Sequence, residues 1–363
     1  MARSLHRAGT RVFALESNPE LPGVRTRCAE VIMVDNLNGS QLIDALLGAA
    51  PRLSENGKPV LLLTNDRMTR TVGEHIDRVL PAYRLSWGAA SERLLPFLDK
   101  SALETRCREV GLLYPSSQVI DSEATLSEAA TRIGFPVIIK PVQPLSSYKT
   151  IILGSSEELP AAWLRIADDG TAIVQRFVTG KETDLYFAAL YLRDGAIRAR
   201  YEGHKLRSRP LGHTTVAIGA RDDALHELAR SFFAGLELSG PVSLELKKDE
   251  EGRHWVIEPT VGRTDFWVGL CPADGINLPQ IEYDDQTGVE PVAMQQADRA
   301  IWINGERDFL AGLWLLRWFP RLLFSRKMVG VYFDFGDMRP YIVSMRSKIA
   351  ALPRRVLNRL KRL

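Results

Sequence analysis

The sequence predicts a mixed α/β (α+β) protein, and two observations carry that prediction. Residues 1–98 alternate short apolar runs with helical segments, which is typical of a small parallel α/β layer. From residue 99 onward, long strand-like runs follow one another through tight polar turns, which is typical of an antiparallel or mixed sheet. With 363 residues, the chain is long enough for two or three domains.

The N-terminal layer opens with a short amphipathic helix. Strand-like runs are predicted at 11–15, 30–35 and 59–66, and helices around 41–50 and 69–80. Parallel layers of this kind normally begin with a strand, and here the chain begins in the helix that follows it. We therefore expect a Rossmann-like domain over residues 1–98 that lacks its first strand.

The second part is predicted in the following order. A helix at 99–112 and a strand at 117–121 precede a helix at 126–133, a strand-loop-strand at 135–153, a helix at 157–166 and a strand at 172–178. Two long strands then meet at Asp194-Gly195, a dipeptide that favours a tight hairpin. A helix at 222–236 leads to a last pair of strands at 241–248 and 253–260.

The strand-loop-strand carries two lysines where its strands meet the loop. Lys140 ends an apolar strand and Lys149 precedes the next one. A charge within an apolar run costs free energy unless an opposite charge compensates it, so these lysines indicate a bound anion. The alternative is that they are surface residues whose stems cover apolar neighbours.

The last pair of strands carries two glutamates. Glu245 lies among apolar residues and Glu258 ends the following strand, so a hairpin would bring both carboxylates to one side of the sheet. Two close carboxylates require a cation, and Mg²⁺ suits them because it takes its other ligands from water and phosphate. The alternative is a pair of structural ion pairs with Lys247 and Arg263.

Composition narrows the classes of function. The three cysteines are far apart, without Cys/His clusters, so neither a disulfide framework nor a structural zinc site is expected, and a reducing cytoplasm fits. The N-terminus has no apolar core of the signal-peptide type.

The C-terminus is strongly basic. Residues 320–363 carry 11 Lys/Arg and 2 Asp/Glu, a charge of +9, which leaves −6 for residues 1–319 of a chain whose total is +3. This segment predicts no specific nucleic-acid binding. Its aromatic helix either packs on the body with a solvated tail, which we favour, or makes weak peripheral contact at the inner membrane surface.

In their order and spacing, these motifs resemble the ATP-grasp superfamily, in particular its carboxylate-amine ligases. The resemblance implies an ATP-grasp fold over 99–290 with an ATP lid at about 137–180, preceded by the domain at 1–98 and followed by a C-terminal extension at 291–363. It also implies ATP and Mg²⁺ (or Mn²⁺) as cofactors, with a small-molecule carboxylate and an amine as substrates, joined through an acyl phosphate.

The resemblance assigns roles to particular residues. It implies phosphate contacts from lysines and from hydroxyls in the lid loop, an adenine-binding strand end followed by acidic ribose contacts, a metal site, and a basic strand facing the transferred phosphoryl group. The nucleotide-binding residues would be Lys100, Lys140, Ser146, Ser147, Lys149, Gln175, Arg176, Phe177, Val178, Glu182 and Asp184. The metal ligands would be Glu245, Glu258 and Thr260, and the catalytic residues Lys205, Arg207 and Arg263.

Besides the missing first strand, two features depart from the family pattern. The lid loop is glycine-free, and Thr260 stands where many relatives have asparagine. Lys205, Arg207 and Arg209 alternate, which predicts that they share one face of a strand. Two other functions stay open from the sequence: phosphoryl transfer by a kinase-like use of the same fold, and a non-catalytic ATP sensor or scaffold.

Overall fold

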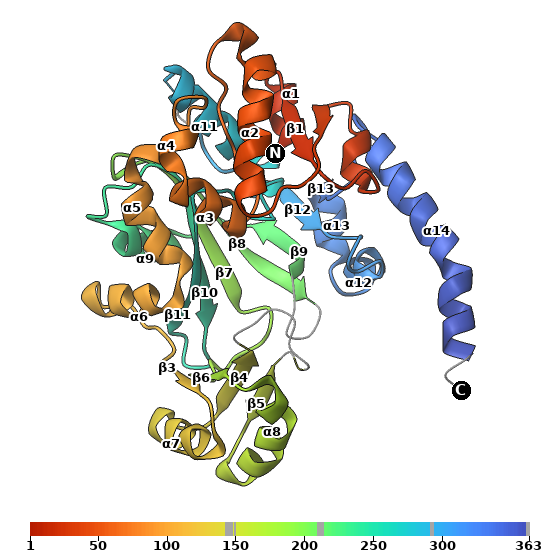
Figure 1. Ribbon diagram of the computed structural model, residues 1–363. Coiled ribbons are helices and arrows are strands. Elements are labelled where there is room, and N and C mark those ends of the chain that lie inside the picture. The colour runs from red at the N-terminus through yellow and green to blue at the C-terminus, as the bar shows by residue number, and fades with distance from the viewer. Residues whose placement is uncertain (142–147, 149, 209–213, 291–293, 361–363) are drawn as a thin grey trace.

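The computed structural model contains a large sheet, a small sheet and a two-stranded N-terminal layer (Figure 1). It describes residues 1–141, 148, 150–208, 214–290 and 294–360, without the side chains of residues 56, 100, 101, 169, 323 and 351–360. Figure 1 shows the small sheet in a lower lobe, the large sheet in the centre and the N-terminal layer at the top. The predicted mixed α/β fold class is confirmed.

The N-terminal layer keeps the predicted alternation but pairs only two strands in parallel. Its elements are α1 (Ala2–Arg7), β1 (Phe13–Glu16), β2 (Glu30–Met33), α2 (Ser40–Leu53), α3 (Asp66–Glu74), α4 (Ile76–Val79) and α5 (Ser91–Leu94). The strand predicted at 59–66 is reduced to one bridge between Val60 and Arg84. A cavity of about 610 Å³, lined mainly by apolar residues, touches both β1 and residues 58–64. In the described part of the chain, no strand lies between β1 and residues 58–64, and the parallel layer has two strands.

The large sheet has seven strands in the order β11-β10-β7-β8-β9-β12-β13. All neighbours are antiparallel except β12 and β13. The turn from β7 to β8 is the predicted one: Asp194 and Gly195 have φ of 50° and 77°, which suits a two-residue hairpin turn. The strands are β7 (Leu185–Arg193), β8 (Ala196–Ser208), β9 (Thr214–Gly219), β10 (Gly240–Lys248), β11 (His254–Val261), β12 (Ala300–Ile303) and β13 (Lys327–Gly330).

The two faces of this sheet pack on different elements. One face, here called the α11 face, presents Phe187, Tyr201 and Ala217 to a core that includes Trp267 and residues of α10 (Leu270–Ala273) and α11 (Leu278–Thr287). The opposite face, here called the α9 face, packs on α9 (Asp223–Phe233) and the N-terminal helices. Near β9 the α9 face packs on α12 (Ala311–Trp318). Successive side chains of a strand point to opposite faces of the sheet. Polar side chains of neighbouring strands can therefore contact one another only where they lie on the same face.

The lower lobe is a four-stranded antiparallel sheet in the order β3-β6-β4-β5, packed on α7 (Glu123–Ile133) and α8 (Leu159–Ile166). Its strands are β3 (Ser117–Ile120), β4 (Val137–Pro141), β5 (Ile151–Leu153) and β6 (Ala172–Arg176). Ile139 lies opposite Ile151, so the two strands of the predicted strand-loop-strand pair directly. The helix α6 (Lys100–Glu109) leads into the lobe.

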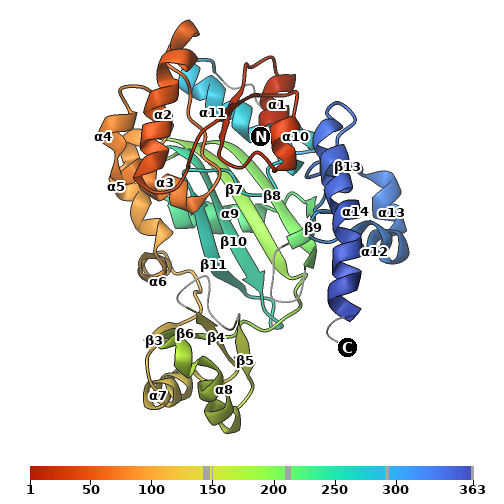
Figure 2. The same ribbon diagram turned by 45° about the vertical axis from the view of Figure 1, so that its right-hand side comes forward.

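The C-terminal segment joins the large sheet through β12 and β13. The helices α12, α13 (Pro320–Ser325) and α14 (Arg339–Leu360) lie on the same side of the molecule (Figure 2). In the described part of the chain, no helix is both long and apolar enough to cross a membrane.

Candidate active site

The β10–β11 hairpin aligns the two predicted metal-binding glutamates. Glu245 lies directly opposite Glu258 in the strand register, and Thr260 lies opposite Ser243 one step further along the same face. Directly opposite residues on antiparallel strands have Cβ atoms about 5 Å apart. The structure thus brings the two carboxylates together on the α11 face.

The carboxyl of Glu245 is held in an unfavourable environment. The pKa of Glu245 is raised to about 8, mainly by burial and also by the charges of Glu258 and Asp265, while the charges of Lys205 and Lys140 lower it. A carboxyl of this kind keeps its proton near neutral pH unless a cation stabilises the ionised form. The pair therefore fits a divalent cation.

Few side chains at this hairpin can act as metal ligands. In the part of the chain that the structure describes, no cluster of three or more His, Cys, Asp or Glu side chains is arranged to hold a metal. A metal on Glu245 and Glu258 would take further ligands from phosphate oxygens and water, which suits Mg²⁺.

Lys205 is a buried cation beside these acids. Its side chain is only 5% exposed, and burial lowers its pKa while Glu245 and Glu182 raise it. The register explains this proximity: Glu245 lies opposite Phe187, which lies opposite Gly203, two residues before Lys205 on β8. An amine buried beside carboxylates is suited to neutralise an anion that enters the site.

Lys140 reaches the site from the lower lobe. Its Nζ donates to Oε1 of Gln175 at 2.7 Å, and Nε2 of Gln175 donates to the carbonyl oxygen of Pro115 at 3.2 Å. The charge of Lys140 also lowers the pKa of Glu245, so the two side chains lie within electrostatic reach. The other predicted phosphate contacts, Ser146, Ser147, Lys149 and the side chain of Lys100, lie outside the described residues.

The predicted adenine-binding segment ends strand β6. The amides of Arg176 and Phe177 donate to the carbonyl oxygens of Ser116 (2.9 Å) and Pro136 (3.0 Å). Val178 is buried, and Nζ of Lys247 lies 5.1 Å from the centre of the Phe177 ring. These two amides are already hydrogen-bonded within the lower lobe. An adenine ring would therefore have to bind other backbone groups of this segment.

The predicted ribose contacts, Glu182 and Asp184, lie near Lys247. Burial lowers the pKa of Lys247, and the charges of both carboxylates raise it. Ser208 donates to Glu182, and the amide of Lys181 donates to Oδ2 of Asp184 at 2.7 Å. These carboxylates border the same polar region as Lys205.

Arg207 differs from its sequence-based expectation. A register shift after Lys205 places Lys205 opposite Ala217 but Arg207 opposite Val216, so the two side chains point to opposite faces. Nε of Arg207 donates to Oδ2 of Asp308 at 2.6 Å, on the side of α12. The prediction of one shared face is wrong for this pair because the bulge breaks the period of two, and Arg209 lies outside the described residues.

Arg263 is joined to the N-terminal layer. Its Nε and Nη2 donate to the two carboxylate oxygens of Asp66, at the start of α3, over 2.6 and 3.0 Å. The charges of Asp265 and Glu258 also raise the pKa of Arg263. Arg263 thus lies near the acids while paired with another part of the chain.

Sequence reasoning missed Asp265 and Asp66 as residues of this region and named Lys247 only as an alternative ion-pair partner of the glutamates. Oδ2 of Asp265 accepts from the hydroxyl of Thr260 at 3.3 Å, and burial raises the pKa of Asp265. For Asp265 and Lys247 a signal existed, since one follows Thr260 by five residues and the other follows Glu245 by two on the same strand. Asp66 had none, because its contact with Arg263 spans 197 positions.

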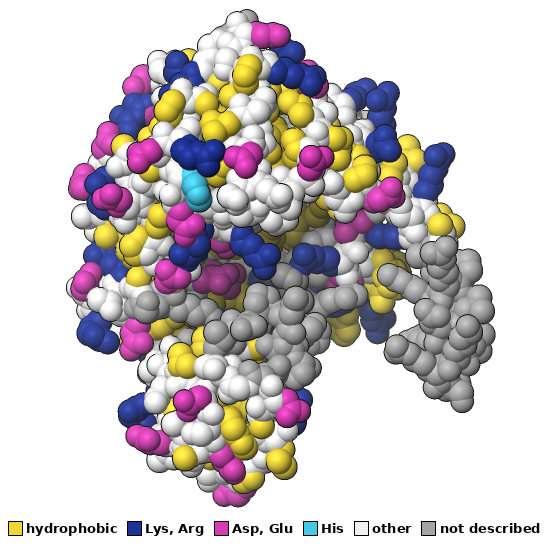
Figure 3. Space-filling view, in the orientation of Figure 1, with side chains coloured by type: hydrophobic (Ala, Val, Ile, Leu, Met, Phe, Trp, Pro, Cys, Tyr) yellow, Lys and Arg dark blue, Asp and Glu magenta, His cyan; other side chains and the backbone are white. Residues whose placement is uncertain are grey.

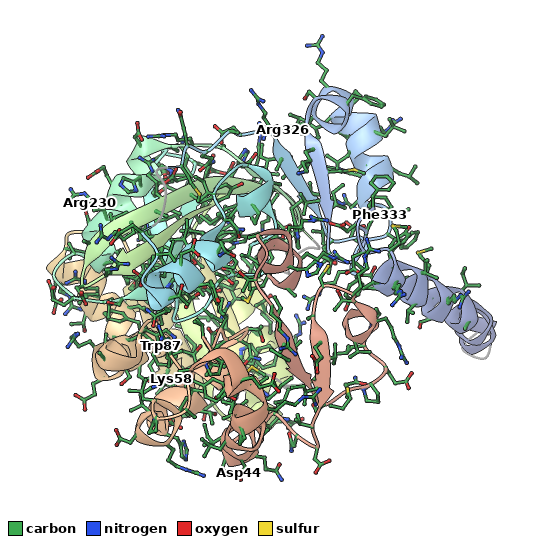
Figure 4. All side chains as sticks on the ribbon, turned by 90° about the horizontal axis from the view of Figure 1, so that it is seen from above. Asp44, Lys58, Trp87, Arg230, Arg326 and Phe333 are labelled. Atoms are coloured by element: carbon green, nitrogen blue, oxygen red, sulfur yellow. The ribbon has the colours of Figure 1, made fainter. Side chains whose placement is uncertain are left out.

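These charges gather at the junction between the lower lobe and the rest of the molecule. Figure 3 shows Lys/Arg and Asp/Glu side chains side by side across the middle of the molecule, just above the lower lobe. Above this region, the indole nitrogen of Trp87 donates to the carbonyl oxygen of Gly262 at 2.9 Å. This hydrogen bond connects the N-terminal helices, among which Figure 4 labels Trp87, to the segment that follows β11.

Comparison with known proteins finds ligases among the chains that are similar to this one. No protein-family model matches the chain. The chain is 27% identical over 198 residues to the D-alanine–D-alanine ligase of Pseudomonas putida strain GB-1, which covers 51% of this chain and 62% of that protein. It thus spans less than two thirds of the length of such curated relatives.

Solved structures extend the likeness to the whole fold. The biotin carboxylase domain of a Hydrogenobacter thermophilus 2-oxoglutarate carboxylase, solved with MgADP and bicarbonate, superposes with a TM-score of 0.61 at 14% identity, over 81% of this chain and 68% of that one. The L-amino acid ligase of Bacillus licheniformis gives 0.57 at 17% identity, over 80% and 71%. At such low identities the likeness establishes a shared fold.

Proposed function

Because the chain has the ATP-grasp fold of these proteins, we propose that it is an ATP- and Mg²⁺-dependent ligase that joins a small-molecule carboxylate to an amine. The observation that carries the proposal is the pairing of Glu245 with Glu258 beside the buried Lys205. Two carboxylates that require a cation, with lysines placed to meet phosphates, suit a nucleotide site. The relatives named as D-alanine–D-alanine and L-amino acid ligases support the same reaction class.

In this proposal, the reaction has two steps. An oxygen of the substrate carboxylate attacks the γ-phosphorus of ATP, so that a C–O–P link forms and ADP leaves. The amine then attacks the acyl carbon, the new C–N bond replaces the C–O bond, and inorganic phosphate and a proton leave. Mg²⁺ or Mn²⁺, when bound, would neutralise the phosphate charges.

The side chains of the chain supply positioning and charge. Glu245 and Glu258 would hold the metal, with Thr260 placed beside Asp265 as a further hydroxyl at the hairpin. Lys140 would contact the phosphates from the lower lobe, and Lys205 would offset the charge of the moving phosphoryl group. Arg263 would meet the substrate carboxylate by exchanging its contact with Asp66.

Hydroxylamine trapping tests the proposal. The full chain is incubated with Mg-ATP, hydroxylamine and pools of carboxylic acids, and ADP and hydroxamates are measured. We expect a hydroxamate that Glu258→Gln abolishes and that Glu250→Gln, a change at an exposed turn residue of the same hairpin, leaves intact. A stable phosphorylated product without hydroxamate would instead indicate a kinase, and ATP binding without ADP formation a sensor or scaffold.

A specific observation favours a second property, peripheral contact with an anionic membrane. The helices α12 and α13 and the residues just before them expose several large apolar side chains. The four most exposed ones among the described side chains, which we call the α12–α13 surface, are Phe309 (78% exposed), Leu313 (65%), Trp318 (61%) and Phe324 (79%). Arg317 and Arg321 are interspersed, and the basic C-terminal helix α14 lies on the same side of the molecule (Figure 2). Apolar side chains flanked by cations match the interface of anionic lipids.

Vesicle sedimentation tests this contact. We expect the protein to bind vesicles containing phosphatidylserine and not vesicles of pure phosphatidylcholine, and to be released by salt. Leu313→Asp should weaken binding at least fivefold. Leu164→Asp, which changes an even more exposed leucine (80%) in the lower lobe, should leave binding unchanged. An equal effect of both variants would reject the α12–α13 surface.

A further inference from the structure

On the large sheet, a row of side chains on neighbouring strands runs from Lys205, in the candidate active site, to a cavity that has no role in the proposed function so far. On the α11 face, Lys205 of β8 lies opposite Ala217 of β9, Ala217 lies opposite Trp302 of β12, and Trp302 pairs with Val329 of β13. Paired residues of neighbouring strands point to the same face. With strands about 4.8 Å apart, Trp302 lies about 10 Å from Lys205 along the sheet.

Trp302 and Val329 line a cavity of about 1050 Å³. The cavity lies between the N-terminal helix α1, the segment 266–277 and the C-terminal segment 327–340. Figure 4 labels Phe333, a lining residue, where the strand pair β12–β13 meets α14. Its volume is at the upper end for small-molecule sites, so it has room for a ring with a substituent.

The lining is largely apolar. Phe266 and Met328 are each 48% exposed, and the rings of Phe266 and Trp302 are 5.4 Å apart. Apolar side chains left open to a cavity gain free energy when a ligand covers them, at about 25 cal/mol per Å². The large apolar or aromatic residues include Phe266, Val268, Trp302, Met328, Val329 and Phe333.

Most charges of the lining are compensated inside the wall itself. Arg3 donates to Oδ2 of Asp337 at 3.0 Å and to the carbonyl oxygen of Tyr332 at 2.8 Å, and Arg7 pairs with Asp334. Lys327, a further cation of the lining, is exposed to solvent, where it can contact a polar end of a ligand. The wall thus favours a ligand with an uncharged body.

The cavity is also linked to the acids through the chain. Phe266 directly follows Asp265, whose charge raises the pKa of Glu245 and whose Oδ2 accepts from Thr260. The wall of the cavity at Phe266 is therefore one residue along the chain from an acid of the candidate site, although Lys205 and Glu245 do not themselves line the cavity.

We propose that this cavity holds the carboxylic acid substrate and that this acid carries an aromatic or large branched apolar group, which Phe266, Trp302 and Met328 contact. This inference rests on the proposed ligase function and goes beyond it by naming the substrate class. The C-terminal segment would then select the substrate, because β12, β13 and the loop after them form one wall of the cavity.

The experiment has a kinetic arm and a binding arm. ADP release is measured with Mg-ATP and hydroxylamine for acetate, isobutyrate, phenylacetate and 3-phenylpropionate. We expect kcat/KM for 3-phenylpropionate to exceed that for acetate at least 50-fold. Phe266→Ala should raise KM for 3-phenylpropionate about tenfold, a larger change than it causes for acetate.

The binding arm uses calorimetry of 3-phenylpropionate with the full chain. Phe266→Ala changes a half-exposed side chain, which protects the test from a folding defect, and Phe324→Ala, an exposed phenylalanine of α13 outside the cavity, is the matched control. We expect Phe266→Ala and Met328→Ala to weaken binding and Phe324→Ala to leave it unchanged.

The two arms separate the two hypotheses. Hydroxamate formation without preference for aromatic acids, or equal effects of Phe266→Ala and Phe324→Ala, overturns the cavity assignment and leaves the ligase proposal standing. Binding of 3-phenylpropionate that Phe266→Ala weakens, without ADP release from any acid, supports the cavity as a binding site and rejects the ligase.

Discussion

At the scale of single residues, Glu245 connects the fold to the proposed chemistry. Its carboxyl lies on a strand between apolar neighbours and faces Glu258 across the hairpin. Burial and the charges of Glu258 and Asp265 favour its protonated form, and together they outweigh Lys205 and Lys140. The site therefore stores an unfavourable interaction that a bound cation relieves.

This interaction predicts a pH dependence of stability. Because folding raises the pKa of Glu245 from 4.5 to about 8, the folded chain binds more protons, and the stabilising contribution is full below pH 4.5 and lost as the pH rises through about 8. Without divalent cations, Glu245→Gln should therefore become increasingly more stable than the native chain between pH 5 and 9. Urea unfolding in EDTA measures this, with the exposed Glu128→Gln as control; parallel curves for all three proteins would contradict it.

Lys140 gives a prediction for nucleotide binding. Lys140→Ala should raise the Kd of ATP roughly 10- to 150-fold, since hydrogen bonds to charged groups contribute about 1.5–3 kcal/mol. Calorimetry with Mg-ATP measures the effect. Arg132→Ala, which removes an exposed cation from α7 in the same lobe, should change the Kd less than twofold. Unchanged affinity in Lys140→Ala would remove this lysine from the site.

At the scale of elements, the register of the large sheet brings the acids near Lys205. Gly203 makes this possible, because a Cβ there would lie 2.4 Å from the carbonyl oxygen of Ile218 and 2.4 Å from the Phe187 ring. The bulge after Lys205 then sends Arg207 to the other face. A single irregularity thus decides which cations reach the acids.

Two glycine substitutions test this packing in opposite directions. Gly203→Ala should destabilise the protein by about 1–3 kcal/mol, because the sheet has no room for a methyl group. Gly48→Ala, in helix α2 where nothing lies within 4 Å of the added Cβ, should stabilise it by about 0.5–1 kcal/mol. Urea unfolding compares them, and a neutral Gly203→Ala would show that the strands can separate at little cost.

The elements themselves were largely predictable from the sequence. The hairpin at Asp194-Gly195, the Glu245/Glu258 strand pair and the lobe strands around Lys140 follow from local periodicity and turn chemistry. The predicted strand at 59–66 was the main exception. An apolar run forms a strand only where a neighbour supplies hydrogen bonds, and here the described chain supplies one bridge.

At the scale of the whole molecule, the proposed site collects groups from separate parts of the chain. Lys140 comes from the lower lobe, Lys205 and Glu245 from the large sheet, and Asp66 reaches Arg263 from the N-terminal layer. A nucleotide bound here would contact both the lower lobe and the large sheet. Binding should therefore stabilise the whole fold.

This gives a prediction on ligand-linked stability. ADP at 100 times its Kd should stabilise the protein by about 2.7 kcal/mol. In a chain of 363 residues that corresponds to a rise in Tm of about 3–4 °C, because the entropy of unfolding is about 2.1 cal/mol/K per residue. Thermal unfolding with Mg-ADP, ADP with EDTA and Mg²⁺ alone separates the contributions. We expect EDTA or Glu258→Gln to remove most of the rise, and a full rise in EDTA would exclude a metal on the glutamate pair.

The sequence by itself determined the elements and the chemistry that they carry: the order of helices and strands, the paired glutamates and the lysines of the lower lobe. These depend on interactions between near neighbours in the chain, which periodicity and turn residues record. Only the tertiary structure decided the direction of Arg207, the pairing of Arg263 with Asp66 and the cavity beside Trp302. These depend on a bulge and on contacts between segments up to 334 positions apart, such as Arg3 with Asp337, and no local pattern encodes such contacts.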